Sequence, residues 1–232
     1  EWEYLANSRT PEAYNKIVKG NADIIFVAQP SGGQKKRAEE SGVTLIYTPF
    51  AREAFVFIVN VDNPVNSLTE QQVRDIFSGA ITNWRTVGGN DQEIQTWQRP
   101  EDSGSQTVMQ SQVMKNVRMI SPQETEVASM MEGMIKVVAE YRNTNNAIGY
   151  TFRYYATQMN DDKNIKLLAI NGIAPTAENI RNGKYPYIVD AFMVTRENTT
   201  SETQKLLEWF LTPQGQSLVE DVGYVPMYKT LP

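Results

Sequence analysis

The sequence of 232 residues contains neither cysteine nor histidine. Without cysteine, the chain can form no disulfide bond and offers no thiol nucleophile. Without histidine, it lacks the base of a Ser-His-Asp triad and the commonest protein ligand for transition metals. Any chemistry must therefore come from carboxylates, lysine, tyrosine and hydroxyl groups, and no catalytic centre, metal site or cofactor is expected.

An excess of positive charge is also lacking, since 22 Lys and Arg residues stand against 27 Asp and Glu residues, for a formal net charge of −5. A nucleic-acid partner is not expected, because such proteins need a basic surface that neutralises phosphates. No apolar run approaches the roughly 20 residues of a membrane-spanning helix. The hydrophobic residues, 41% of the chain, suffice instead for one large domain or two small lobes.

What the sequence does offer is a polar loop between a strand and a helix, in residues 97–107 (WQRPEDSGSQT). Asp102 and Ser103 are favourable N-cap residues, and Gly104 allows the backbone to approach a ligand closely. The first amides of a helix lack partners and carry the positive end of its dipole, so they attract anions. Arg99 adds a forked cationic contact. The same pattern also serves as an ordinary helix cap, so both interpretations stay open.

Six further motifs accompany this loop. In chain order they are Asn63-Pro64-Val65, Ile76-Phe77-Ser78-Gly79, Thr82-Asn83-Trp84, Val87-Gly88-Gly89, Ile148-Gly149-Tyr150 and Gly223-Tyr224-Val225-Pro226. Together with the loop they resemble the phosphate-binding proteins of bacterial ABC importers, and the resemblance covers most of the chain. It implies a two-lobed α/β fold of the periplasmic-binding-protein-like type II, with a two-strand hinge. We expect residues 1–62 plus 189–232 to form lobe one, and residues 63–188 to form lobe two.

The resemblance also implies which residues bind the ligand. In that family an arginine, followed four positions later by Ser-Gly-Thr, grips an oxyanion. Arg99 and Ser103-Gly104-Ser105 stand at this spacing, with Ser105 in place of threonine. These four residues are the strongest candidates, and lobe two contributes all of them.

Two weaker candidates, Thr10 and Gln29, come from lobe one. Open α/β sheets place ligands at the carboxyl ends of parallel strands, and the apolar run 22–28, which we expect to form such a strand, ends just before Gln29. Family members commonly have at this point an Asp that accepts the proton of hydrogen phosphate. Because a glutamine can donate or accept, the anion could be phosphate, a fully ionised anion such as sulfate, or something larger.

The course of the chain between the lobes is predicted from strand patterns and chain breakers. Residues 43–47 and 53–60 are expected to form two separate strands, and the chain is expected to cross between lobes near residues 60–64 and 186–191. Family members usually begin with a further strand and helix, which open on a Gly-Ser-Thr loop that touches the ligand. Nothing in this sequence corresponds to them, so this N-terminal strand and helix are expected to be absent.

The function that follows is that of an extracytoplasmic solute-binding protein, monomeric, which delivers a small oxyanion, most simply phosphate, to the membrane permease of an ABC importer. The family implies a periplasmic or cell-surface location, with lipid anchoring through an N-terminal part that is missing from this sequence. One alternative is a sensing or adhesion module whose anion site has degraded. Another is a hydrolase that uses Glu53, or Glu101 with Asp102; such carboxylates are far more often caps or solvated charges, so an enzyme is not expected.

Overall fold

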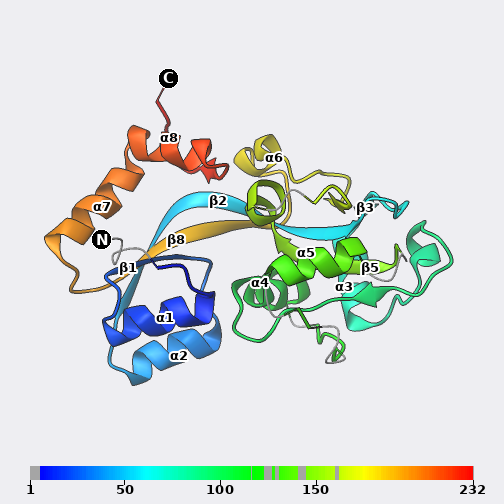
Figure 1. The fold of residues 1–232 in the computed structure, drawn as a ribbon, viewed down its shortest axis with the longest axis horizontal. Coiled ribbons are helices and arrows are strands. Elements are labelled where there is room, and N and C mark those ends of the chain that lie inside the picture. The colour runs from blue at the N-terminus through cyan, green and yellow to red at the C-terminus, as the bar shows by residue number, and fades with distance from the viewer. Residues whose placement is uncertain are drawn as a thin grey trace.

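The computed structural model describes residues 6–115, 117–122, 127–128, 131–140, 145–159 and 162–231. Their helices and strands form two groups that are joined by two strands, β2 (Leu45–Asn60) and β8 (Ile188–Arg196) (Figure 1). We call the group around α1 (Thr10–Lys19), α2 (Gly32–Glu40), α7 (Ser201–Leu211) and α8 (Pro213–Asp221) lobe one. The group around α3 (Glu70–Ser78), α4 (Gly104–Val108) and α5 (Met131–Glu140) is lobe two. The two-lobed α/β architecture predicted from the sequence is confirmed, whereas the boundaries at 62/63 and 188/189 stay a prediction.

Strand β2 is the structural link between the lobes. It pairs with β8 from Leu45 to Ala54, and with β5 (Ala147–Phe152) from Phe55 to Val59. The prediction of two separate strands here is wrong, because a bulge between Pro49 and Ala51 absorbs the proline and lets one strand continue. The change of partner falls at Ala54 and Phe55, earlier than the predicted crossing near 60–64.

The main sheet runs in the order β1-β8-β2-β5-β4, with β6 (Ile165–Leu167) and β9 (Val225–Pro226) also paired to β2. Strand β1 (Ile24–Val27) pairs antiparallel with β8, so the prediction of a parallel strand in the run 22–28 is wrong. The pairing of β4 (Gln95–Thr96) with β5 is parallel. An apolar run shows that a strand is half-buried or buried, but it does not show the direction of its neighbour.

Three hydrophobic clusters stabilise the lobes. In lobe two, side chains from β2 and β5 pack with those of α3 (Glu70–Ser78) and α5 (Met131–Glu140) in one large core, which also contains Trp84. In lobe one, α1 (Thr10–Lys19) covers one face of the sheet, while α7 (Ser201–Leu211) and α8 (Pro213–Asp221) cover the other. The two ends of β2 are therefore held in separate cores, which leaves the middle of the strand as the connection.

The remaining elements are short and complete the two lobes. They are α2 (Gly32–Glu40) in lobe one and, in lobe two, β3 (Ser67–Leu68), η1 (Trp84–Val87), α4 (Gly104–Val108), the π-helical turn η2 (Met109–Met114), the second π-helical turn η5 (Tyr155–Met159), β7 (Ala169–Ile170) and α6 (Ala177–Arg181). A helix long and apolar enough to cross a membrane is absent from the described residues.

The contact between α7 and α8 gives a first testable prediction. A Cβ atom on Gly215, in the first turns of α8, would lie 2.6 Å from Phe210 Cα. Alanine normally stabilises a helix by about 0.5–1 kcal/mol relative to glycine. We expect Gly215→Ala to do the reverse and to lower the unfolding free energy by about 2 kcal/mol, because backbone atoms cannot move aside. Urea unfolding measures this difference.

The matched control is Gly133→Ala. Gly133 lies in the interior of α5, and a Cβ added there would meet nothing within 4 Å. This variant should be as stable as the parent chain or more stable. Equal, small effects of the two substitutions would show that α7 and α8 do not pack as closely as the structure has them.

Candidate functional site

Arg99 is held at the point where the chain leaves the sheet of lobe two. Its backbone N–H donates to the Tyr150 hydroxyl at 3.1 Å and to Gln106 Oε1 at 3.4 Å. The side chain is 8% exposed, and its Nη1 donates to the carbonyl of Ala128 at 2.6 Å. The Tyr150 hydroxyl in turn donates to Gln106 Oε1, and burial raises the pKa of the Tyr150 phenol, so this group stays a neutral donor. Both ends of Arg99 are therefore fixed.

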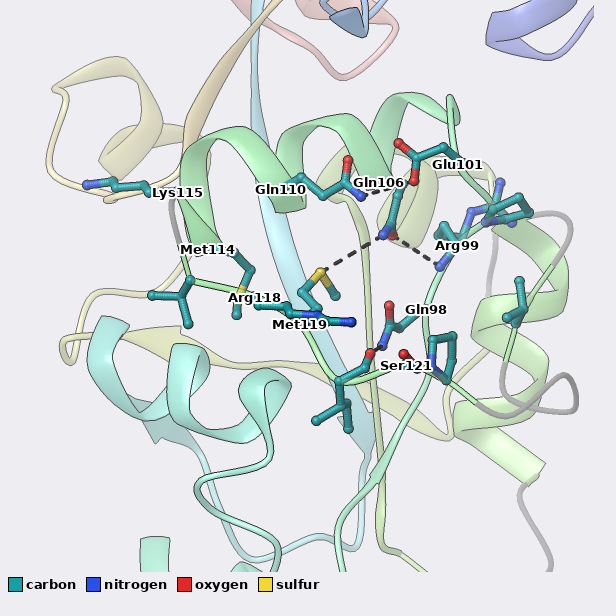
Figure 2. A pocket seen from close by; sticks show the side chains of 15 residues that line it. Gln98, Arg99, Glu101, Gln106, Gln110, Met114, Lys115, Arg118, Met119 and Ser121 are labelled. Carbon is teal, nitrogen blue, oxygen red and sulfur yellow. Dashed lines mark hydrogen bonds between the residues drawn. The ribbon is translucent and has the colours of Figure 1, made fainter. Parts of the chain in front are cut away.

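A cavity of about 610 Å³ lies beside this arrangement in lobe two (Figure 2). On its wall, the Gln106 side chain donates to Met119 Sδ at 3.9 Å and accepts from the Arg99 backbone N–H at 3.4 Å. Gln98 donates to the carbonyl of Ile120 at 2.8 Å. These amides fix the loop that carries Arg99.

The helix that follows Arg99 begins where the sequence predicts. Ser103 is the N-cap of α4, and its hydroxyl accepts from the amide of Gln106 at 3.2 Å. Ser105 lies in the first turn and is fully buried. Helix α4 continues directly into η2, so the helical run extends from Gly104 to Met114. The prediction of a helix cap at this loop is confirmed.

A cavity of about 370 Å³ separates this loop from lobe one, and we call it the interlobe cavity. Its lining comes from residues 8–11 at the start of α1, from residues 99–101 and 103–105, and from Tyr155. The lobes come close together at its edge, since a Cβ atom on Gly104 would lie 3.2 Å from Ala28 Cβ and 3.3 Å from Thr10 Oγ1. The structure thus brings five of the six predicted site residues to one cavity.

Two polar groups on the wall of the interlobe cavity are buried without a hydrogen-bond partner among the described residues. They are Nε of Arg99 and Oγ of Ser105. Arg99 also has no acidic ion-pair partner in the described part of the chain. Burial lowers the pKa of Arg99 below its usual value, but an arginine remains charged at neutral pH. An unpaired, buried cation beside an unpaired hydroxyl is costly unless an anion occupies the cavity.

Gln29, the sixth predicted residue, does not line the interlobe cavity. Its Nε2 donates to Ser111 Oγ at 2.8 Å, and its Oε1 accepts from Gln112 Nε2 at 3.4 Å. Both partners lie on η2 of lobe two. Gln29 therefore connects the lobes beside the cavity, and its contact with a ligand stays a prediction.

Asp102 makes a second connection between the lobes, which sequence reasoning missed. Its carboxylate accepts from the Ser31 hydroxyl and from Arg37 Nη2, the latter at 3.0 Å, and its carbonyl accepts from Gln34 Nε2 at 3.0 Å. All three donors belong to α2 or its N-cap. Asp102 has a φ of 63°, in the left-handed region that aspartate tolerates better than most residues. Helix α2 thus holds the loop in front of Ser103.

These contacts predict a pH-dependent contribution of Asp102 to stability. The Ser31 hydroxyl and Arg37 lower the pKa of the Asp102 carboxyl from 3.8, so the folded state favours the ionised form. This contribution is complete above the unfolded pKa and is lost as pH falls through the lower, folded pKa. We expect Asp102→Asn to lower the unfolding free energy by about 1 kcal/mol at neutral pH.

Urea unfolding of both proteins from pH 7 down into the acid range below 3.8 would measure this difference. The difference in unfolding free energy between the parent chain and Asp102→Asn should disappear as the Asp102 carboxylate is protonated. Glu101→Gln provides the control, since Glu101 contacts Gln110 at 3.1 Å within lobe two. A gap of constant size across this pH range would contradict the assignment.

Of the carboxylates considered for hydrolysis, Glu53 lies apart from the other two, because it lines a cavity at the junction of the lobes. Glu101 and Asp102 line a further cavity together, where the Asp102 carboxylate is bound to Ser31 and Arg37. The described residues contain no group of three or more acidic side chains that could hold a metal ion. Sequence reasoning also missed Arg9, which lines the interlobe cavity. Arg9 stands in no motif that could have indicated its position.

Comparison with known proteins decides the family. A model of the PBP superfamily domain matches residues 4–214, which is most of the chain. The chain belongs to the PBP superfamily. The resemblance to phosphate-binding proteins of ABC importers, stated above from the motifs, is confirmed by the relatives of this superfamily member that follow.

This PBP superfamily member is similar to curated bacterial proteins. It is 29% identical over 209 residues to the phosphate-binding protein PstS of Bacillus subtilis (strain 168), an alignment that covers 90% of this chain and 64% of the relative. It is 26% identical over 218 residues to PstS of Borreliella burgdorferi, with 91% and 74% covered. The chain therefore spans about two thirds of the length of these relatives.

Two solved structures have the same fold. A putative phosphate ABC transporter substrate-binding protein with bound phosphate, from Clostridium perfringens, has a TM-score of 0.74 and 24% identity, with 93% of this chain and 84% of that chain covered. An ABC-type phosphate transport receptor from Vibrio cholerae has a TM-score of 0.69 and 24% identity, with 96% and 85% covered.

Proposed function

We propose that the chain binds a small oxyanion with a phosphate-like head in the interlobe cavity. The observation that carries this proposal is the pair of buried, unpartnered groups on the cavity wall, Arg99 Nε and Ser105 Oγ. A tetrahedral oxyanion offers acceptors to both groups at once, and its charge compensates the buried guanidinium. The names of the relatives, phosphate-binding protein PstS in two bacteria, support phosphate as the simplest ligand.

We further propose that the bound anion favours the closed arrangement of the lobes. Arg99 and Ser105 come from lobe two, while the start of α1, at Thr10, comes from lobe one. An anion that contacts both sides only in the closed form shifts the population toward that form. The connection through the middle of β2 allows this movement while each lobe keeps its own core.

The biological role that fits is delivery of the anion to the membrane permease of an ABC importer, in an extracytoplasmic location and without catalysis. The support is the similarity to PstS proteins and to a phosphate ABC transporter substrate-binding protein. Turnover of a panel of phosphoesters by the purified chain would contradict the absence of catalysis.

The test is a titration that follows thermal unfolding of the purified chain with phosphate, sulfate and molybdate, after unfolding and refolding to remove any carried-over ligand. A ligand that binds only the folded state, at 100 times its dissociation constant, adds roughly 2.7 kcal/mol of stability. A raised unfolding midpoint with phosphate supports the proposal, and a rise with sulfate alone changes the specificity. Indifference to every oxyanion would overturn it in favour of a sensing or adhesion module.

A further inference from the structure

A second cavity, of about 210 Å³, lies where β2 and β8 join the two lobes, and we call it the hinge cavity. Aromatic rings make up much of its wall, and they come from both lobes: Phe26, Phe50, Phe152, Tyr154, Tyr155 and Tyr224. Two of them stack, since the ring centroids of Tyr154 and Tyr224 are 4.2 Å apart at an interplanar angle of 16°. The hinge cavity is therefore largely aromatic.

The hinge cavity also contains a buried carboxylate. Glu53, on β2, is 4% exposed and accepts hydrogen bonds from the amides of Ala54 at 2.7 Å and Tyr154 at 2.8 Å. Burial raises the pKa of Glu53 to about 7, against the effect of the two amides and of Arg153. Asp190 lines the same cavity. Neither carboxylate has an ion-pair partner within the part of the chain that the structure describes.

The hinge cavity adjoins the interlobe cavity. Thr10 and Tyr155 belong to the linings of both. A Cβ atom on Gly104, beside the proposed anion, would lie 3.8 Å from Cε2 of Phe152, which is part of the aromatic wall. A molecule bound at Arg99 thus has an aromatic, acidic compartment immediately next to it.

We propose that the ligand of this chain is an organic phosphate or phosphonate that carries an ammonium group on a short aliphatic linker. This inference rests on the proposed function, because the phosphorus group occupies the interlobe cavity at Arg99 and Ser105. The linker passes Thr10 and Tyr155, and the ammonium group lies in the hinge cavity near Glu53 and the aromatic rings. Inorganic phosphate fills only the first compartment.

The physical reason is that each compartment lacks what the other end of such a ligand supplies. A buried guanidinium without an anion and a buried carboxylate without a cation are both costly, and one zwitterionic molecule compensates both. Aromatic faces add cation–π attraction to an ammonium group. Because Phe26 and Tyr224 belong to lobe one and Phe152 to lobe two, the ammonium end also contacts both lobes.

The test compares matched ligands by isothermal titration calorimetry at about pH 8, above the pKa of Glu53. Phosphoethanolamine is compared with ethyl phosphate, and aminoethylphosphonate with ethylphosphonate, so that each pair differs in the amine alone. We expect the amine to tighten binding by about tenfold in each pair. Phosphocholine then shows whether the cavity prefers a primary or a quaternary ammonium.

Two variants make the location of the amine testable. Glu53→Gln should remove the advantage of the amine and leave the affinity for ethyl phosphate unchanged, which also shows that the variant is folded. Tyr224→Leu should reduce the same advantage while Glu53 stays unchanged. If Glu53→Gln does not fold, Tyr224→Leu alone tests the position of the amine.

The outcomes separate this inference from the proposed function. Binding of ethyl phosphate and phosphoethanolamine with equal affinity overturns the inference and leaves the oxyanion site standing. An amine advantage that survives both variants overturns the placement in the hinge cavity. Failure of every phosphate and phosphonate, with Arg99 intact, overturns the inference, and failure of sulfate and molybdate as well overturns the proposed function.

Discussion

Replacement of Arg99 by methionine should weaken the binding of phosphate, or of any other anion that occupies the interlobe cavity, by roughly 100-fold. The guanidinium is 8% exposed and is the charged group on the wall that lacks an acidic partner among the described residues. Hydrogen bonds to a charged partner contribute about 1.5–3 kcal/mol, and each 1.4 kcal/mol corresponds to about a factor of ten in affinity. Calorimetric titration of both proteins measures the change.

We expect the Arg99→Met protein to lose affinity for the anion without losing stability. A buried charge without a counter-ion destabilises the ligand-free fold, so the unfolding free energy without ligand should stay equal or rise. The stabilisation by added phosphate should disappear. Loss of affinity together with a large loss of stability would mean that Arg99 acts as a structural group through its bond to Ala128.

Arg118→Met is the matched control for this substitution. Arg118 lies on the other side of the loop, on the wall of the cavity shown in Figure 2, and does not line the interlobe cavity. Its replacement removes the same charge from the same lobe and should leave anion affinity nearly unchanged. Equal losses of anion affinity in the two variants would indicate a long-range effect of net charge. Unchanged anion affinity in Arg99→Met would mean that the anion binds elsewhere.

Local signals in the sequence were sufficient to predict the helix at the site. The cap formed by Ser103 depends on residues within four positions, and the structure shows its hydroxyl accepting from Gln106 as a cap requires. The motif that contains Arg99 and Ser105 therefore predicted a real piece of local structure. That these residues bind an anion stays a prediction, because the spacing predicts where the residues lie but not whether an anion binds to them.

The errors concern contacts between distant segments. The run 22–28 was predicted to form a parallel strand, but β1 pairs antiparallel with β8, whose sequence lies more than a hundred residues further on. Residues 43–47 and 53–60 were predicted to form two separate strands, but a bulge between Pro49 and Ala51, which depends on the partner strand, lets β2 continue. In both cases the partner decides the outcome, and periodicity along one segment carries no information about it.

The same limit explains what the sequence did not indicate. Asp102 contacts Ser31 and Arg37 across the lobes, at sequence separations of 71 and 65 residues. Glu53 contacts the amide of Tyr154, which lies 101 residues away. A carboxylate in a loop or a strand has many ordinary explanations, and only the folded arrangement shows that Glu53 lines a cavity next to the proposed anion site.

Closure of the lobes over the anion can be tested at Gly104. The replacement Gly104→Val should reduce affinity by about 30-fold. A Cβ atom there would already lie 3.2 Å from Ala28 Cβ and 3.3 Å from Thr10 Oγ1, and valine adds two more methyl groups. Overpacking of this kind costs about 2 kcal/mol, and here it falls on the closed form alone because Ala28 and Thr10 belong to lobe one. Calorimetry measures the affinity, and small-angle scattering with and without phosphate measures the closure.

The control for this substitution is unusually well matched. Gly32 follows the N-cap Ser31 just as Gly104 follows the N-cap Ser103, but a Cβ atom on Gly32 would meet nothing within 4 Å. Gly32→Val thus makes the same change at the same helical position and should leave affinity nearly unchanged. If Gly104→Val bound phosphate as tightly as Gly32→Val and closed to the same extent, the close approach of the lobes at Gly104 could not belong to the ligand-bound form, and the cavity would have to bind its anion from lobe two alone.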